Sequence, residues 1–142
     1  KLYQNLPKYL KNKIKNLHAV HKHLSRRNVS EVSNLSDEQK KLTPDVIHPL
    51  IRTHPLSNNK SVYINPNRID HIVGYNEKES DKILDELYNF SFQSKFQYNH
   101  NYRKGDLVIW DNRCTMHKAN TEYDINQLRV MHRVMLKGES VF

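Results

Sequence analysis

The feature that constrains this chain most is a short apolar run between two polar turns near its C-terminal end. Residues 107–110 read Leu-Val-Ile-Trp, with Gly-Asp directly before them and Asp-Asn directly after. A β-branched run of this length between turn residues is typical of a buried strand. A second strand pattern, over residues 128–136, contains two arginines. We therefore expect two neighbouring strands of one sheet in this part of the chain.

One histidine, His117, follows the first of these runs after a polar bend. A histidine and an arginine on neighbouring strands can face a common cavity. A neutral imidazole is a good ligand for Fe(II), and a guanidinium binds a carboxylate through two parallel hydrogen bonds. The spacing therefore suggests a metal ion and an organic acid held side by side.

The residues around His117 resemble the C-terminal signature of a known family. Residues 105–120 read Gly-Asp-Leu-Val-Ile-Trp-Asp-Asn-Arg-Cys-Thr-Met-His-Lys-Ala-Asn, and Arg-Val-Met-His-Arg follows at 129–133. These motifs are similar to those of the taurine dioxygenase (TauD/TfdA-like) family, whose members are Fe(II)- and 2-oxoglutarate-dependent oxygenases. Blocks at 48–55, 60–65, 72–74 and 77–80 follow the same family's order.

The resemblance implies an α+β fold of the double-stranded β-helix (jelly-roll) type with flanking helices. Residues 1–142 would form the C-terminal portion of a single dioxygenase domain. It also implies that His117 is an iron ligand, that Arg129 binds the far carboxylate of 2-oxoglutarate, and that Arg133 binds the acidic group of the substrate. Arginine suits both anions because it keeps its charge and binds bidentately. The competing interpretations are a core histidine at 117 and structural ion pairs at 129 and 133.

The chain departs from the family's pattern in one respect. The family takes its other two iron ligands from a His-x-Asp pair on an earlier strand, and none of the nine histidines here is followed two positions later by Asp or Glu. Lys1 is also not an initiator methionine. We therefore expect a fragment that is inactive alone. An open sheet would expose apolar surface and strand edges, which favours association such as a homo-oligomer.

Three functions follow as hypotheses. The first is part of a dioxygenase that uses Fe(II), 2-oxoglutarate and O2 to hydroxylate a small acidic substrate (a sulfonate or carboxylate), with release of succinate and CO2. The second is a non-catalytic, anion-binding relic of the same fold. The third is a basic nucleic-acid-binding module, because the net charge is +8. The lysines are scattered without an arginine-rich stripe, which disfavours the third hypothesis.

Composition narrows the cellular setting. No apolar run is long enough to cross a membrane, and no secretory signal opens the chain. Cys114 is the only cysteine, which excludes an intrachain disulfide and a cysteine metal cluster. These features favour a cytoplasmic protein.

Periodicity predicts the elements of the first two thirds of the chain. Apolar residues at helical spacing predict a helix over residues 7–23, with His18, His21 and His23 near its C-terminal end. A favourable interaction with the helix dipole explains histidines at this place better than a shared metal site does. The polar residues 26–44 predict a surface loop, either a lid or a linker.

The middle of the chain predicts a hairpin and a second helix. Residues 46–53 and 61–64 have strand patterns joined by turn residues, and His48 and His54 each precede a proline at a strand end. Tyr63 faces either the cavity or the outside of its strand. Asn76 predicts the N-cap of a helix that ends near Phe90, and residues 96–102 predict one more strand.

Overall fold

The computed structural model describes residues 1–28, 36–120, 124, 126 and 128–138. The helices in order are α1 (Leu2–Asn5), α2 (Lys8–Ile14), α3 (Asp37–Leu42) and α4 (Glu77–Ser91), followed by the 3-10 helix η1 (Ser94–Phe96). The strands are β1 (His18–His21), β2 (Val46–Pro49), β3 (Ile51–Thr53), β4 (Lys60–Val62) and β5 (Ile69–Ile72). Within the described residues, none of the helices is long and apolar enough to cross a membrane.

The strands form two antiparallel sheets. One has the order β2-β1-β5, and the other is the β3-β4 hairpin. Ala19 of β1 lies opposite His48 of β2 and Ile72 of β5, so these three side chains share one face. The pairing of β1 with β5 shifts between Val20 and His21, where the strand is irregular. Antiparallel pairing agrees with the fold class expected from the sequence, while the jelly roll itself stays a prediction.

Leu50 joins the two sheets. It is fully buried, and it separates β2 from β3. Its N–H donates to the carbonyl of Leu17 at 2.9 Å, and its carbonyl accepts from the N–H of Tyr63 at 2.8 Å. The predicted strand over residues 46–53 is therefore present but divided between two sheets at this corner.

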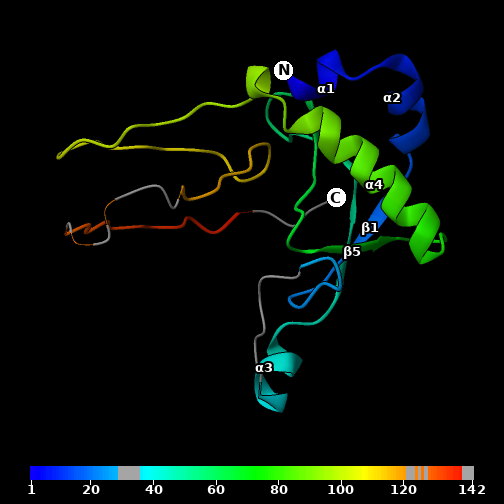
Figure 1. The fold of residues 1–142 in the computed structure, drawn as a ribbon, viewed down its shortest axis with the longest axis horizontal. Helices are drawn as coiled ribbons and strands as arrows, with labels where there is room; N and C mark the ends of the chain where they lie inside the picture. Colours follow the sequence, from blue (N-terminus) through cyan, green and yellow to red (C-terminus); the bar gives the residue numbers. More distant parts are fainter. Residues whose placement is uncertain (29–35, 121–123, 125, 127, 139–142) are drawn as a thin grey trace.

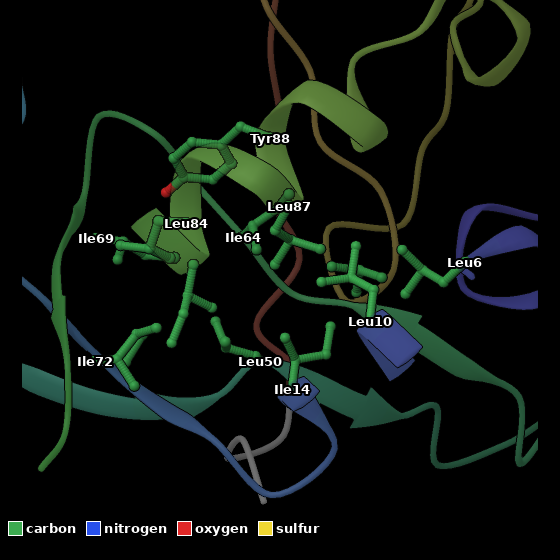
Figure 2. Packing of buried hydrophobic residues seen from close by; sticks show 13 residues of the cluster. Leu6, Leu10, Ile14, Leu50, Ile64, Ile69, Ile72, Leu84, Leu87 and Tyr88 are labelled. Atoms are coloured by element: carbon green, nitrogen blue, oxygen red, sulfur yellow. The ribbon is translucent and has the colours of Figure 1, made fainter. Parts of the chain in front are cut away.

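Helices cover one face of the three-stranded sheet (Figure 1). Leu10 and Ile14 of α2 and Leu84 and Leu87 of α4 are fully buried, and Figure 2 shows their side chains meeting those of β5 and its neighbours. The spacing of the apolar residues explains this packing, because residues three and four apart share one face of a helix. The cluster contains Leu6, Leu10, Ile14, Ala19, Leu50, Val62, Ile64, Ile69, Ile72, Ile83, Leu84, Leu87 and Tyr88.

The start of α4 matches the prediction. The side chain of Asn76 accepts a hydrogen bond from the N–H of Glu79 at 2.9 Å, as an N-cap should. On the buried side, the hydroxyl of Ser80 accepts from the N–H of Ile72 at 2.8 Å and ties the helix to β5. The predicted supporting role of this helix outside the sheet is confirmed.

The predicted helix over residues 7–23 is wrong in its second half. Helix α2 ends at Ile14, and residues 18–21 form β1 between β2 and β5. Sheet pairing on both sides outweighs the weak helical preference of this His- and Val-containing segment. His18 and His21 consequently lie on a strand, where residues three apart face opposite sides. The helical spacing that suggested a shared metal is absent.

Residues 26–44 are not a plain loop, because α3 lies within them. Residues 29–35 of this predicted lid or linker lie outside the described part of the chain. Sequence reasoning also missed β5, whose four residues supply two fully buried isoleucines to the core.

The segment after η1 differs most from expectation. In Figure 1 it runs, coloured yellow to red, as long extended traces beside the helical body. The predicted strands over residues 96–102, 107–110 and 128–136 do not form in the described structure. Leu107, Ile109 and Leu128 are 84%, 85% and 93% exposed. A strand needs a partner for its backbone N–H and C=O groups, and none of the described strands pairs with these residues.

Candidate functional site

The structure places His117 at the end of a short ordered turn. Its ring centroid lies 4.8 Å from that of Trp110, with the rings inclined by 51°. The indole N–H of Trp110 donates to the side-chain oxygen of Asn112 at 2.9 Å, which satisfies the polar atom of this large side chain. His117 itself is exposed. The segment from Trp110 to Asn112 therefore holds the indole ring beside His117.

Arg129 and Arg133, the predicted anion-binding residues, are both exposed. A guanidinium nitrogen of Arg133 lies 3.0 Å from the sulfur of Met135. The expected sheet that would carry His117 and Arg129 on adjacent strands is absent from the described residues. Their roles therefore remain predictions.

Asp111 organises the turn before His117. Its carbonyl accepts hydrogen bonds from the N–H and hydroxyl of Thr115, at 3.0 and 2.6 Å, and from the N–H of Cys114 at 3.2 Å. Its carboxylate accepts from Nε and Nη2 of Arg113, with the shortest contact at 2.7 Å, and from the Arg113 N–H at 2.8 Å. Hydrogen bonds from Arg113 and then from His54 hold the pKa of this carboxyl far below its usual range.

His54 reaches the same carboxylate from the β3-β4 hairpin. Its Nε2 lies 3.0 Å from Oδ2 of Asp111, and its side chain is mostly buried. Its other ring nitrogen, Nδ1, accepts from the backbone N–H groups of Leu56 and Ser57 at 3.3 and 3.2 Å. A nitrogen that accepts carries no proton in a neutral imidazole, so Nε2 carries the hydrogen and donates it to Asp111.

The proton on Nε2 bears on whether His54, Asp111 and Cys114 form a metal site or whether His54 and Asp111 form a hydrogen-bonded pair. One candidate ligand atom from each of His54, Asp111 and Cys114 lies within 4.8 Å of the others, which is close enough for a shared metal ion. However, both ring nitrogens of His54 are engaged, and Arg113 already neutralises the carboxylate. Burial and the charge of Asp111 also raise the pKa of the Cys114 thiol, which disfavours the thiolate form that binds metals. The cluster is best described as a hydrogen-bonded histidine–aspartate pair.

A second group of rings lies where the two sheets meet. The ring of His21 stacks on Tyr63 at 5.7 Å and meets the edge of His48 at 5.0 Å. The guanidinium of Arg52, which is buried, lies 4.9 Å from the centre of the Tyr63 ring. Burial, and secondarily the charge of His48, lowers the pKa of His21 to about 4. Tyr63 therefore packs against histidines and an arginine in this structure.

Ion pairs fix the segment that follows β1 against α4. Arg26 pairs with Asp81 at 2.7 Å, and Arg27 pairs with both Asp81 and Asp85. The backbone N–H of Arg26 also donates to the buried carboxylate of Asp70 at 2.9 Å. These contacts join elements of the scaffold.

Sequence reasoning missed His54 as the partner of Asp111. The two residues are 57 positions apart. The proline after His54 indicates extended backbone, but no spacing in the sequence connects the hairpin with the turn at 111–115.

Comparison with known proteins gives a consistent result. The model of the taurine catabolism dioxygenase TauD, TfdA family matches residues 1–135. An alpha-ketoglutarate-dependent 2,4-dichlorophenoxyacetate dioxygenase from Burkholderia sp. is 36% identical over 136 residues, which are 96% of this chain and 45% of the relative. The (S)-phenoxypropionate/alpha-ketoglutarate-dioxygenase of Sphingobium herbicidovorans is 31% identical over 144 residues, covering 96% of this chain and 49% of that protein.

Solved structures agree. A crystal structure from Burkholderia xenovorans, assigned as an alpha-ketoglutarate dependent 2,4-D dioxygenase, superposes with a TM-score of 0.74 at 36% identity, covering 80% of this chain and 44% of that one. The crystal structure of AAD-2 in complex with Mn(II) and N-oxalylglycine superposes with a TM-score of 0.62 at 26% identity, covering 72% of this chain and 40% of that one. The chain spans about half the length of the curated relatives that it matches. It belongs to the taurine catabolism dioxygenase TauD, TfdA family.

Proposed function

We propose that this chain is the C-terminal part of an Fe(II)- and 2-oxoglutarate-dependent dioxygenase domain that hydroxylates a small acidic substrate, with release of succinate and CO2. The observation that carries the proposal is the ordered turn at 111–115, which presents His117 beside Trp110 inside a family match that covers residues 1–135. Arg129 follows His117 by twelve positions, and the resemblance to the family assigns it to the far carboxylate of 2-oxoglutarate.

The chain supplies side chains of the types that bind the proposed cofactors, but it supplies too few ligands to complete an iron site. His117 is exposed at the end of its turn and supplies one imidazole ligand. Arg129 and Arg133 supply two guanidinium groups, suited to the far carboxylate of 2-oxoglutarate and to the anionic group of the substrate. When bound together with 2-oxoglutarate, Fe(II) would supply the oxidising chemistry. The remaining ligands would come from the part of the domain that the relatives have and this chain does not span.

The same partial coverage accounts for the exposed apolar residues. Residues 107–110 and 128–136 have strand patterns, yet Leu107 and Leu136 are 84% and 91% exposed. We infer that these segments pair with strands of the rest of a jelly-roll domain. We refer to this chain joined to that preceding part as the complete domain. The isolated chain is expected to self-associate through the exposed segments.

The names of the relatives and the presence of Arg133 support the proposed substrate class. Relatives that match most of this chain are named for 2,4-dichlorophenoxyacetate, for (S)-phenoxypropionate and for a sulfate ester. Each of these compounds joins an organic group to an acidic one. Small carboxylates, sulfonates and sulfate esters are therefore the compounds to test first.

The test is succinate formation by the complete domain with a panel of these acids. His117→Ala should abolish turnover, because no other side chain replaces the lost imidazole. His132→Ala is the matched control, since alternation along a strand places residue 132 on the face opposite Arg129 and Arg133. Full activity without the His117 imidazole would contradict the assignment. Binding of 2-oxoglutarate without any turnover would instead favour a non-catalytic relic.

A further inference from the structure

The hydrogen bond between His54 and Asp111 joins two parts of the chain that are 57 positions apart. His54 directly follows β3 of the hairpin, and Asp111 begins the turn that leads to His117. The separation between Nε2 and Oδ2 is 3.0 Å, and the donor faces a carboxylate. Hydrogen bonds to charged acceptors are stronger than those between neutral groups.

The hairpin end of this contact is rigidly built. The N–H of His54 donates to the carbonyl of Asn59 at 2.8 Å, and its carbonyl accepts from the N–H of Asn58 at 2.9 Å. The ring is fixed as well, because its Nδ1 accepts from the N–H groups of Leu56 and Ser57. Contacts within the hairpin therefore fix the direction of the Nε2–H group independently of its hydrogen bond to Asp111.

At the other end of this contact, the turn links Asp111 to His117. Asp111 holds the backbone of Cys114 and Thr115 through its carbonyl, and His117 follows Thr115 by two residues. Trp110, the residue before Asp111, contacts the ring of His117 at 4.8 Å. The turn is thus closed on both sides of Asp111, and displacement of Asp111 moves His117 with it.

We propose that His54 is a positioning residue: through Asp111, it fixes the turn at 111–115 against the β3-β4 hairpin and so sets where His117 presents its imidazole. This inference rests on the proposed function, in which His117 is a metal ligand. His54 does not touch the metal in this arrangement, since both of its ring nitrogens are engaged.

Two substitutions separate the two functions of the ring. His54→Asn keeps a side-chain oxygen near the place of Nδ1, which preserves the acceptor for the hairpin, but it is too short to reach Asp111. His54→Gln places its amide nitrogen near the position of Nε2 and retains the donor to Asp111. Comparison of the two variants isolates the contact with the turn from the stability of the hairpin.

The first readout uses the complete domain without metal. Cys114 is the only cysteine of this chain and lies inside the turn, so, with any cysteine of the preceding part replaced by serine, its rate of reaction with a disulfide thiol reagent reports the order of that turn. Trp110 is the only tryptophan of this chain, so, with any tryptophan of the preceding part replaced by phenylalanine, the emission reports the contact with His117. His54→Asn should raise the Cys114 rate several-fold and shift the Trp110 emission. His54→Gln should leave both close to the parent.

The second readout is Mn(II) affinity in the presence of N-oxalylglycine, measured by electron paramagnetic resonance. Loss of a residue that orients a ligand typically weakens metal binding by about 10- to 100-fold. We expect about a tenfold loss for His54→Asn and less than threefold for His54→Gln. If His54→Asn matches the parent in thiol reactivity, emission and affinity, the proposal is wrong.

Two further outcomes are distinguishable. If His54→Asn fails to fold, Asp111→Ala, which leaves the hairpin intact, should give the same loss of affinity and the same gain in Cys114 reactivity. If the parent domain binds no Mn(II), the proposed function fails. The thiol and emission measurements then still decide whether His54 orders the turn, since neither requires metal.

Discussion

The indole ring of Trp110 lies 4.8 Å from the imidazole ring of His117, with an angle of 51° between the ring planes. Asn112 accepts the indole N–H, so the orientation of the indole is set by its own turn. Trp110 is the only tryptophan in the chain. A metal ion bound at His117 would therefore lie close to the one fluorescent indole of this chain, which becomes the sole reporter once any tryptophan of the preceding part is replaced by phenylalanine.

Mn(II) should quench the emission of Trp110 in the complete domain. A paramagnetic ion quenches a nearby indole, and the contact between the two rings places the ion close when His117 is a ligand. A fluorescence titration with Mn(II) checks this prediction. His117→Asn should remove the saturable quenching, whereas the control His132→Asn should retain it. Equal quenching in all three proteins would place the metal elsewhere.

Arg129 and Arg133 should affect different substrates of the proposed reaction. Arg129→Lys should raise the KM for 2-oxoglutarate about 10- to 100-fold, because lysine is a point charge that lacks bidentate geometry, and hydrogen bonds to charged groups contribute ~1.5–3 kcal/mol. Arg133→Lys should raise the KM for the acidic substrate and leave that for 2-oxoglutarate nearly unchanged. Steady-state kinetics with each compound varied in turn provides the measurement.

A different pattern at position 133 would identify a structural role. If Arg133 forms an ion pair within the scaffold, Arg133→Lys should lower the midpoint of thermal unfolding and leave the KM for the acidic substrate unchanged. The thermal midpoint of the complete domain should therefore be measured alongside the kinetics. An unchanged midpoint together with a raised KM supports substrate binding.

Local signals predicted the elements that depend on local chemistry. The N-cap at Asn76 is visible in the sequence because the capping side chain and the N–H that it accepts are three residues apart. The hairpin after residue 51 is likewise marked by its turn residues. Both depend on neighbours in the chain, and the structure confirms both.

Elements that depend on distant partners were harder to predict. Residues 18–21 satisfy a helical pattern, yet pairing with β2 and β5 makes them a strand. The bond from His54 to Asp111 has no counterpart in local spacing. Residues 107–110 have the composition of a buried strand but are largely exposed, since no described strand pairs with them. The family signature identified the candidate site residues, which periodicity alone did not.

The exposure of Leu107 provides a test of the proposed complete domain. In the isolated chain Leu107 is 84% exposed, so Leu107→Ala should change the free energy of unfolding by less than ~0.5 kcal/mol. Leu87 is fully buried against the sheet, so Leu87→Ala should cost about 2–5 kcal/mol in the same chain. Urea unfolding followed by circular dichroism measures both.

In the complete domain, by contrast, we expect Leu107→Ala to lower the free energy of unfolding strongly. If residues 107–110 form a buried strand there, Leu107→Ala should cost about 2–5 kcal/mol, as Leu87→Ala does. The Leu87 variant serves as the internal control in both proteins. A cost below ~0.5 kcal/mol in the complete domain would contradict the inferred strand pairing.

The half-buried ring of His21 should make the protein sensitive to mild acid. Burial, with a smaller contribution from His48, lowers the pKa of His21 from 6.5 to about 4 in the folded state. Between these two values the unfolded chain binds a proton that the folded chain does not, so stability falls as the pH decreases. The stability is fully present above pH 6.5 and is lost progressively as the pH falls toward about 4.

Replacement of His21 by phenylalanine tests whether this histidine causes the predicted fall in stability at low pH. The variant keeps a ring for stacking on Tyr63 and for the edge contact with His48, but it cannot titrate. The free energy of unfolding in urea, measured from pH 7 to pH 4, should fall less steeply for His21→Phe than for the parent. His48 also has a lowered pKa, because of burial and the charge of Arg52, so some acid sensitivity should remain. Identical slopes in the two proteins would show that His21 binds its proton as readily in the folded state as in the unfolded chain, and that its burial does not exclude the charge.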